Sequence, residues 1–463
     1  MVSAYLELEE HKVFHHPADE EITGDVVDKF VKLHMAKLPR YRRLKKLYES
    51  KGPILEQEGK AEYKPDNRLV VNNAKEIVDS YNGFFIGVPV KVTHQEQTVT
   101  KFVDEFRKRN SLDDVESEAS KLSAIYGHSY IYVFQNEESE TCVTFNSPLD
   151  MFIVYDDTIQ EEPLFAVRYK PTDTGYEGQL FIKGKELYIL NDATGTILTE
   201  LDEDQDRFYY NDIQIIEWKE NEERTSVFEP VETLINAMNK ALSSKMNDID
   251  YFADAYLAVL GADLDSGSLQ DIRDNRIINL FGTDNIKDIV VKFLDKPDGD
   301  TSQENFLDRV ERLIYEKSMI ANINDESFGN ASGVALEFKL QPMKNLAINK
   351  ERKVKVAMKR MYKLIFSVPL QLPNNMIDEW KNLNFTFTRN IPRNVSDEAE
   401  TAGKLQGVVS KETQLSVLSI VDNVQEEIER INTEREEKSV IDMEQDENGD
   451  FVVTQSNDVN EDE

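Results

Sequence analysis

The sequence predicts an α+β fold, in which helices, short strands and then long helices follow one another along the chain. Apolar residues recur every three or four positions between residues 19 and 126, which is typical of amphipathic helices. From Ser129 to Trp218 the period falls to two, in short β-rich runs separated by Asp, Asn, Gly and Pro. After residue 229 the helical period returns over stretches of about 30 residues, which at about 1.5 Å per residue are long for a compact domain.

The N-terminal part is expected to form three helices, over residues 19–50, from Asn72 to Phe85 and from Thr98 to Tyr126, with a short strand from Val88 to Val92. The first helix carries a basic cluster made of Arg40, Arg42, Arg43, Lys45 and Lys46. Such a cluster is typical of a nucleic-acid-binding patch. In a strongly acidic chain, however, a solvated helix side or a contact with acidic neighbours is the favoured interpretation.

Seven short strands are expected next, in one antiparallel sheet that ends near Glu223. They run from Tyr130 to Phe134, Thr141 to Phe145, Met151 to Tyr155, Leu164 to Tyr169, Gln179 to Ile182, Glu186 to Leu190 and Ile213 to Trp218. The stretch from Gly178 to Lys185 lacks the spacing of a phosphate-binding loop, so we expect a hairpin there.

Two long helices with a small module between them follow the strands. Pro230 suits the first turn of one helix, which is expected to continue to Gly261 with Leu260 on its buried stripe. The module, residues 263–297, contains a strand around Val290–Phe293. Because Thr301 and Glu304 have capping-box spacing, they are expected to begin the second helix. Its expected buried stripe is Phe306, Val310, Leu313 and Ile320.

A third long helix is expected from Val334 to Phe366, followed by an irregular segment, residues 367–395, with one strand from Phe385 to Thr388. Shorter helices then begin near Ser396, Ser410 and Asp422. Past Glu437 the chain is polar and acidic with few apolar residues, which predicts disorder.

The third long helix is unusually basic. Between Lys339 and Lys363 it has nine basic side chains and a single acid, Glu351. On a helical wheel one face carries Arg352, Lys355, Lys359 and Lys363, and the opposite face carries Val354, Met358, Met361 and Ile365. This basic face either contacts a polyanion or is a solvated side paired with acidic neighbours, and the sequence favours neither.

Composition limits the function. The 463 residues include 88 acidic and 54 basic side chains, for a formal net charge of −34, so any contact with DNA depends on local basic clusters. A single cysteine, Cys142, excludes a disulfide framework and a thiolate metal cluster, and indicates a reducing compartment. We expect no cofactor, no metal, no signal peptide and no membrane role.

Several segments, in order along the chain, resemble portal proteins of long-tailed phages from Gram-positive hosts. The segments cover most of residues 40–437. They are Arg68-Leu-Val-Val-Asn-Asn, Gly83-Phe-Phe-Ile-Gly-Val-Pro-Val, Tyr126-Gly-His-Ser-Tyr, Pro230 to Asp250, Phe328-Gly-Asn-Ala-Ser-Gly-Val-Ala-Leu-Glu-Phe-Lys-Leu, Asn390-Ile-Pro-Arg-Asn-Val-Ser-Asp-Glu-Ala-Glu, Val409-Ser-Lys-Glu-Thr and Val421-Asp-Asn-Val-Gln-Glu-Glu-Ile-Glu-Arg-Ile.

The resemblance implies a portal fold, whose parts follow in chain order. They are an α/β wing over residues 1–228, a first stem helix over 229–262, a clip over 263–299, a second stem helix over 300–322, a channel loop over 323–333, a long wing helix and return segment over 334–395, a helical crown over 396–438, and an acidic disordered tail over 439–463. The channel loop would include Phe328, Gly329, Asn330, Ala331, Ser332 and Gly333. The basic residues that would face DNA are Lys344, Arg352, Lys355, Lys359 and Lys363.

The resemblance also implies a function. Such a chain would assemble in the host cytoplasm, nucleate the procapsid and form a dodecameric ring at one vertex of the virion. It would conduct double-stranded DNA during packaging and ejection, and would bind terminase, scaffolding and major capsid proteins, and head completion or adaptor proteins. It would not be an enzyme. A nucleic-acid enzyme of the packaging machinery and a monomeric acidic scaffold or adaptor are the alternatives.

Overall fold

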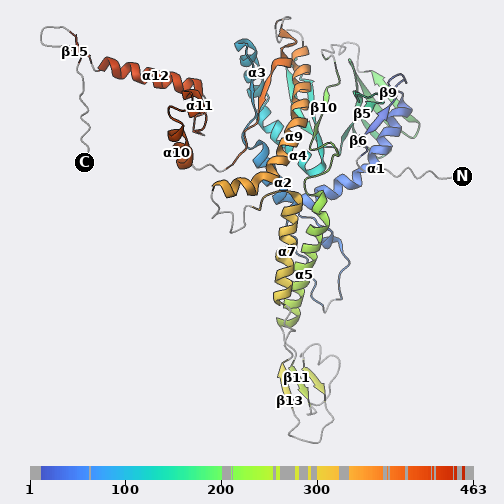
Figure 1. Cartoon of the computed structure of the whole chain (residues 1–463). Coiled ribbons are helices and arrows are strands. Elements are labelled where there is room, and N and C mark those ends of the chain that lie inside the picture. The colour runs from blue at the N-terminus through green and yellow to red at the C-terminus, as the bar shows by residue number, and fades with distance from the viewer. Residues whose placement is uncertain are drawn as a thin grey trace, which may run out of the picture. The chain divides into compact units, whose positions relative to one another are not determined.

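The structure is a computed structural model. It describes residues 12–61, 64–200, 210, 212–253, 257–260, 277–280, 290–293, 300–322, 333–368, 373, 376–391, 395–418, 420–421, 424–441, 443–445 and 451–453. The chain divides into two compact units, Met1–Asn390 and Ile391–Glu463. Figure 1 shows the elements of both units in chain order by colour. The mixture of helices and sheets agrees with the predicted α+β class.

The first unit begins with strand β1 (Phe14–His16) and helix α1 (Gly24–Tyr48), which confirms the first expected helix. The hydroxyl of Thr23 caps α1 by accepting a hydrogen bond from the backbone N–H of Val26 at 3.4 Å. A single 3-10 turn, η1 (Pro53–Glu56), follows where the sequence has Gly52-Pro53.

The second expected helix is confirmed as α2 (Asn73–Ile86), and strand β2 is Lys91–Thr93. The third expected helix is in fact two, α3 (Gln97–Arg109) and α4 (Leu112–Tyr126). Ser111 between them has a φ of 48°, in the left-handed region, so the chain cannot continue as one helix through this residue.

The strand-rich middle forms two sheets where the sequence predicts one. A six-stranded sheet has the order β1-β5-β6-β7-β8-β9, and a three-stranded sheet has the order β10-β3-β4. The strands are β3 (His128–Gln135), β4 (Thr141–Asn146), β5 (Met151–Asp156), β6 (Pro163–Pro171), β7 (Tyr176–Ile182), β8 (Lys185–Asp192), β9 (Gly195–Glu200) and β10 (Ile215–Lys219). All seven expected strands are present, and the expected hairpin joins β7 to β8 through Gly184, which has a φ of +73°.

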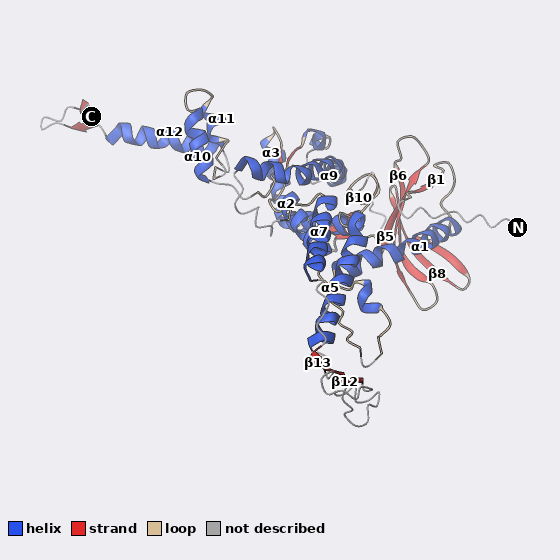
Figure 2. Cartoon of the chain, turned by 60° about the horizontal axis from the view of Figure 1, so that its bottom comes forward, coloured by secondary structure: helices blue, strands red, loops and turns tan. Residues whose placement is uncertain are grey.

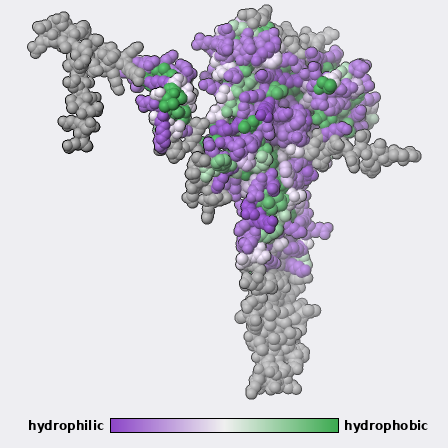
Figure 3. All heavy atoms as spheres, in the orientation of Figure 1, coloured by the Kyte–Doolittle hydropathy of each residue, from purple (hydrophilic) through white to green (hydrophobic). Residues whose placement is uncertain are grey.

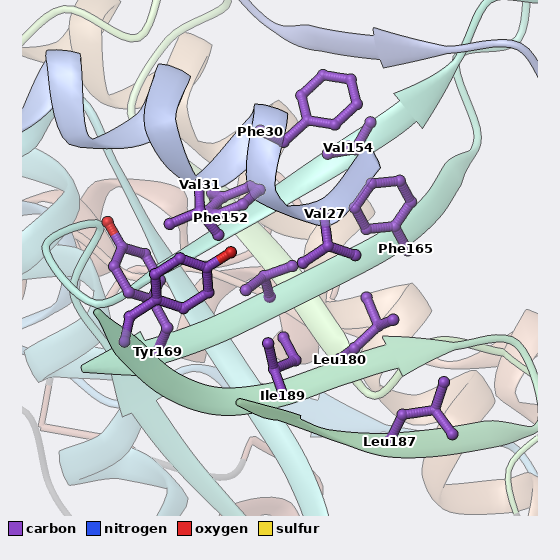
Figure 4. Packing of buried hydrophobic residues seen from close by; sticks show 12 residues of the cluster. Val27, Phe30, Val31, Phe152, Val154, Phe165, Tyr169, Leu180, Leu187 and Ile189 are labelled. Carbon is purple, nitrogen blue, oxygen red and sulfur yellow. The ribbon is translucent and has the colours of Figure 1, made fainter. Parts of the chain in front are cut away.

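Two strands of the larger sheet were missed by the sequence prediction, β1 and β9, which form its two edges. β1 pairs in parallel with β5, so the sheet is not wholly antiparallel. Helix α1 packs across this sheet (Figure 2), and the core between them is apolar. Figure 4 shows Val27, Phe30 and Val31 of α1 against Phe152 and Phe165 of the strands, with the remaining sticks continuing the cluster.

After the two sheets the chain forms a helix, a small sheet and a second helix. The 3-10 turn η3 (Glu229–Val231) leads into α5 (Glu232–Ala253). The small sheet consists of strands β11 (Leu257–Leu260), β12 (Ile277–Leu280) and β13 (Val290–Phe293), and α7 (Asp300–Ser318) follows it. The prediction of helix up to Gly261 is wrong, because Leu257–Leu260 pairs as a strand with both β12 and β13. The strand at Val290–Phe293 is confirmed.

Helix α7 packs against α5 (Figure 1), and Lys245 of α5 forms an ion pair with Glu304 of α7. Thr301 already lies inside α7, so it is not the N-cap that the sequence predicts. The expected buried stripe is confirmed at Val310 and Ile320. Leu307 and Ile314 are buried in place of Phe306, which is half exposed, and Leu313, which is partly exposed.

The third long helix is confirmed as α9 (Gly333–Ser367), followed by the 3-10 turn η6 (Glu379–Asn382) and strand β14 (Asn384–Thr386), which pairs with β2. The second unit contains α10 (Val395–Leu405), α11 (Lys411–Leu415) and α12 (Val424–Ile441), as expected, and the Ser410 hydroxyl caps α11. The expected disorder past Glu437 is wrong for the described residues there, because α12 continues to Ile441 and strands β15 (Met443–Gln445) and β16 (Phe451–Val453) pair.

Candidate functional site on helices α9, α5 and α7

One side of α9 is fixed in the core of the first unit. Val354, Met358, Met361 and Ile365, the four residues predicted on its apolar face, are all at most 1% exposed. The side chain of Tyr362 lies against Phe385 of β14, with ring centroids 5.8 Å apart. The opposite side of α9 is therefore the side that other molecules can reach.

Lys350 lies on the buried side of α9, although it is charged. Its Nζ is 2.5 Å from Glu220 Oε2 and donates to the carbonyl of Ser120 at 3.0 Å. The ring of Phe85 adds a cation–π contact at 5.0 Å. Burial lowers the pKa of Lys350, and the charge of Glu220 opposes this effect. Lys350 was not among the predicted site residues, although Met343, Ala347 and Val354 place it within an apolar stripe.

Three of the five candidate DNA-facing residues have acidic partners within the chain. Lys355 Nζ lies 2.7 Å from Glu351 and Lys363 Nζ lies 3.4 Å from Asp212. Lys344 Nζ is 3.9 Å from Glu337. These pairs fit the interpretation that the basic face is balanced by acidic neighbours, so the five residues do not act as one uniform cationic surface.

Arg352 and Lys359 differ from these three. Both are exposed, and neither has an ion-pair partner among the residues that the structure describes. They lie two turns apart, which places them close together on one face of α9. These two side chains are the described part of the predicted basic face that remains available for a polyanion.

The channel-loop candidates lie almost wholly outside the described residues. Phe328, Gly329, Asn330, Ala331 and Ser332 are not described, and Gly333 is the first residue of α9. The loop therefore joins the part of the chain after α7 to the start of α9 in sequence.

The basic cluster of α1 is part of the protein's own framework. Arg40 is buried and makes two hydrogen bonds to the carboxylate of Glu229, at 2.7 Å and 2.5 Å. Arg43 lies 3.1 Å from Glu232. This arrangement fits the interpretation that the cluster contacts acidic neighbours, and it ties α1 to the start of α5.

The α5–α7 pair carries apolar side chains on its outer surface. Phe306 of α7 is 51% exposed, and Met246 and Ile249 of α5 are 36% and 46% exposed. Figure 3 shows such apolar side chains on this pair among a mostly hydrophilic surface. Phe306 lines a groove of about 350 Å³ together with Ala241, Ser244 and Asp248 of α5. The Gln303 Oε1 atom, which also lines the groove, is buried without a described partner.

The groove and the two apolar residues of α5 lie on different flanks. At about 100° per residue, Met246 points roughly 165° and Ile249 roughly 105° around the helix axis from the mean direction of Ala241, Ser244 and Asp248. One flank is thus a groove with an aromatic edge, and the other is an apolar ridge. A surface of this kind suits contact between unlike flanks of two copies.

The described residues contain no cluster of three or more His, Cys, Asp or Glu placed to bind a metal. Two histidines are held inside the first unit by hydrogen bonds. His34 bonds to Tyr169 and to the carbonyl of Pro148. His128 bonds to Tyr41 and Glu217. Within the described part of the chain, no helix is long and apolar enough to cross a membrane.

Comparison with known proteins gives a consistent result. A model of the family described as "Phage portal protein, SPP1 Gp6-like" matches residues 28–440. The portal protein of Bacillus phage SPP1 is 23% identical over 431 residues, which cover 88% of this chain and 83% of that protein. The portal protein of Clostridium phage phiCD119 is 22% identical over 386 residues, covering 78% and 83%. Among solved structures, a chain from the neck of an empty GTA particle has a TM-score of 0.43 at 9% identity, covering 74% of this chain and 89% of that one.

Proposed function

The chain belongs to the SPP1 Gp6-like family of phage portal proteins, and from this membership we propose that it forms a ring at one capsid vertex through which double-stranded DNA passes. The match of the family model to residues 28–440 carries this proposal. Portal proteins are structural components of the virion and of the head-to-tail connection, so the chain is not an enzyme. The ring assembles in the host cytoplasm from twelve copies and nucleates the procapsid.

In this proposal, α5 and α7 form the stem, and the sheet of β11, β12 and β13 belongs to the clip. The helix, small sheet, helix order supports this assignment. The wing extends to residue 228, the long helix α9 with its return segment belongs to the wing, and α10 to α12 belong to the crown. Terminase and later the head completion proteins bind to the clip, while scaffolding and major capsid proteins contact the ring during procapsid assembly.

Neighbouring copies pack stem against stem. The apolar ridge of Met246 and Ile249 on one copy faces the groove beside Phe306 on the next copy, which would remove apolar surface from water. Such a head-to-tail contact closes into a ring when the rotation between copies divides a full circle. The unpartnered Gln303 Oε1 then has access to a donor from the neighbour.

DNA in the channel meets the loop of residues 323–333 and the exposed cations Arg352 and Lys359. Because a conduit must let DNA slide, a few cations on an otherwise acidic protein suit the task better than a continuous basic surface. Lys344, Lys355 and Lys363 contribute less, since an acidic side chain balances each of them.

Mass measurement of the purified protein tests the ring. A closed particle with a central hole in low-resolution images supports the conduit, whereas a small monomer supports the adaptor alternative. ATP hydrolysis or magnesium-dependent DNA cleavage by the isolated chain would instead support the enzyme alternative.

Phe306→Asp should reduce the fraction of complete rings. Ile159→Asp, at a fully exposed apolar residue of the wing, should leave that fraction unchanged.

Packaging tests the DNA-facing residues. Arg352→Glu combined with Lys359→Glu should leave ring assembly intact and reduce the amount of packaged DNA at least several-fold. Lys29→Glu combined with Lys32→Glu, which makes the same charge change on the exposed side of α1, is the matched control. Equal packaging by both double variants would mean that the basic face of α9 is only solvated.

A further inference from the structure

A second charged region lies far along the chain from the basic face, beneath α1. Side chains of α1, β3, β5 and β10 line a cavity of about 30 Å³. This volume exceeds the roughly 10–15 Å³ that one water-sized particle requires. Four cationic residues line the cavity, namely Lys12, which is exposed, and Lys37, Arg40 and Arg224, which are buried; the one carboxylate in the lining is Glu217.

Each arginine at this cavity already has a carboxylate of its own. Arg224 makes two hydrogen bonds to Glu217, at 2.7 Å and 2.9 Å. Glu217 also accepts from Tyr155 at 2.6 Å and interacts with His128 Nδ1 at 2.8 Å, so its oxygens are fully used. Arg40 is neutralised in the same two-bond manner by Glu229. Among the residues that the structure describes, these two pairs leave one buried positive charge, that of Lys37, without a balancing carboxylate.

Lys37 is only 8% exposed. Its Nζ donates to the backbone carbonyl of Lys12 and lies 4.3 Å from the centre of the Phe14 ring. Among the described residues, no carboxylate lies within ion-pair distance of this ammonium group. A buried charge in this state is costly unless a counter-charge reaches it, and two of its three hydrogens have no described acceptor.

Tyr130 supplies a second donor. It lines the cavity and is 3% exposed, yet no described residue accepts a hydrogen bond from its hydroxyl. The neighbouring tyrosines are already engaged, Tyr41 with His128 at 3.0 Å and Tyr155 with Glu217. The cavity therefore combines one unbalanced ammonium, one free hydroxyl and the edges of aromatic rings.

We propose that this cavity binds one small monovalent anion, of the size of chloride, held by the Lys37 ammonium and the Tyr130 hydroxyl. The anion balances the charge that the two arginine–carboxylate pairs leave over. It also links α1 to the strands beneath it, because its two ligands come from α1 and β3. A neutral water molecule would fill the same space but would leave the ammonium without a counter-charge.

The titration of Lys37 supports this site and provides a test. Burial lowers the pKa of Lys37 to about 8, with further lowering by the charges of Arg224 and Arg40 and a smaller opposing effect of Glu217. The group is thus protonated at pH 7. It faces three titratable or charged groups on its own helix, His34, Arg40 and Tyr41. On the elements packed against α1 it faces Lys12, His128, Tyr130, Tyr155, Glu217 and Arg224. Anion binding should weaken as the pH rises above about 8, where Lys37 loses its proton.

Urea unfolding at constant ionic strength tests the proposal, with sodium chloride replaced stepwise by sodium gluconate, whose anion is too large for the cavity. At pH 7 the unfolding equilibrium constant should fall up to tenfold for each tenfold rise in chloride above the dissociation constant. This dependence should disappear in Lys37→Met and weaken in Tyr130→Phe, which keeps the ring. Lys32→Met, at an exposed lysine of the same helix, should retain it.

Bromide soaked into crystals gives the structural test. An anomalous peak within contact distance of Lys37 Nζ and Tyr130 Oη, weaker in Tyr130→Phe and absent in Lys37→Met, supports the site. Equal stability of the wild-type protein in both salts, together with no bromide at this position, would overturn the proposal in favour of water. Neither measurement depends on ring formation or DNA packaging.

Discussion

Two lysines of α9, Lys350 and Lys359, lie on opposite sides of one helix and have opposite environments. Lys350 is 0% exposed and is held by Glu220 at 2.5 Å, whereas Lys359 is exposed and has no partner among the described residues. The first is part of the framework that holds α9 against the rest of the first unit, and the second is available to an external polyanion. A run of basic residues therefore has no single role, because burial decides the role of each member.

The largest effect is expected from breaking the buried pair. Lys350→Met leaves the buried carboxylate of Glu220 without its cation, which should lower the free energy of unfolding by roughly 3–5 kcal/mol. Urea denaturation followed by tryptophan fluorescence measures this loss, since Trp218 lies in the neighbouring strand β10.

A double variant separates the charge effect from loss of packing. Lys350→Met combined with Glu220→Met removes both charges and should recover most of the lost stability. Lys353→Met, which removes a partly exposed lysine paired with Glu222, should cost about 1 kcal/mol or less. If Lys350→Met costs no more than Lys353→Met, the buried pair does not hold α9 in place.

An effect of medium size on the pH dependence of stability is expected from His34. This buried group is kept neutral, in contrast to Lys350, which is kept charged. Its Nε2 donates to the Pro148 carbonyl at 2.8 Å, and its Nδ1 accepts from the Tyr169 hydroxyl at 2.9 Å. Burial lowers its pKa from 6.5 to about 3, although the bond to Pro148 opposes this. As the pH falls below 6.5, the unfolded chain binds a proton before the folded chain does. Stability should therefore decrease by up to about 1.4 kcal/mol per pH unit between pH 6.5 and about 3.

Comparison of the wild-type protein with His34→Gln isolates this contribution. The variant cannot titrate here but keeps an amide donor for Pro148, so its stability should fall less steeply between pH 6 and pH 4.5. Above pH 7.5 the difference between the two proteins should no longer vary with pH. Parallel pH curves for both would contradict the assignment of His34 as a neutral buried group.

Much of the fold could be predicted because strong periodic patterns decide it. The apolar stripe of α9 and the alternation of β3 to β8 each specify one buried face. The predicted ends of some helices were wrong where the same residues suit both a helix and a strand. Leu257–Leu260 continues the apolar stripe of a helix, yet it pairs with β12 and β13. Basic residues at the end of α3 and Ser111 followed by Asp113 and Asp114 mark a helix boundary, but the apolar period continues across it, so α3 and α4 were expected as one helix.

The candidate site was less predictable, for a physical reason. The helical wheel placed Lys355 and Lys363 on an outward face, but it did not show their acidic partners. Glu351, the partner of Lys355, lies on the same helix, whereas Asp212, the partner of Lys363, comes from a distant loop. Asp212 becomes a neighbour only through the tertiary fold, which periodicity does not reveal. Lys350 was overlooked because charge suggests exposure, and only Glu220 and Ser120, both distant in sequence, explain its burial.

The smallest effect is expected among the residues on the exposed side of α9 itself. Lys355→Gln removes the pair with Glu351 and a cation–π contact with Phe387 at 5.7 Å, and should cost about 0.3–0.5 kcal/mol. Lys359→Gln removes no described contact and should change the free energy of unfolding by less than about 0.5 kcal/mol. Both are measured by urea denaturation at one protein concentration, with and without added salt. Because salt screens exposed ion pairs, added salt should reduce the loss of unfolding free energy caused by Lys355→Gln. A loss above about 1 kcal/mol for Lys359→Gln would mean that this lysine, like Lys350, belongs to the framework.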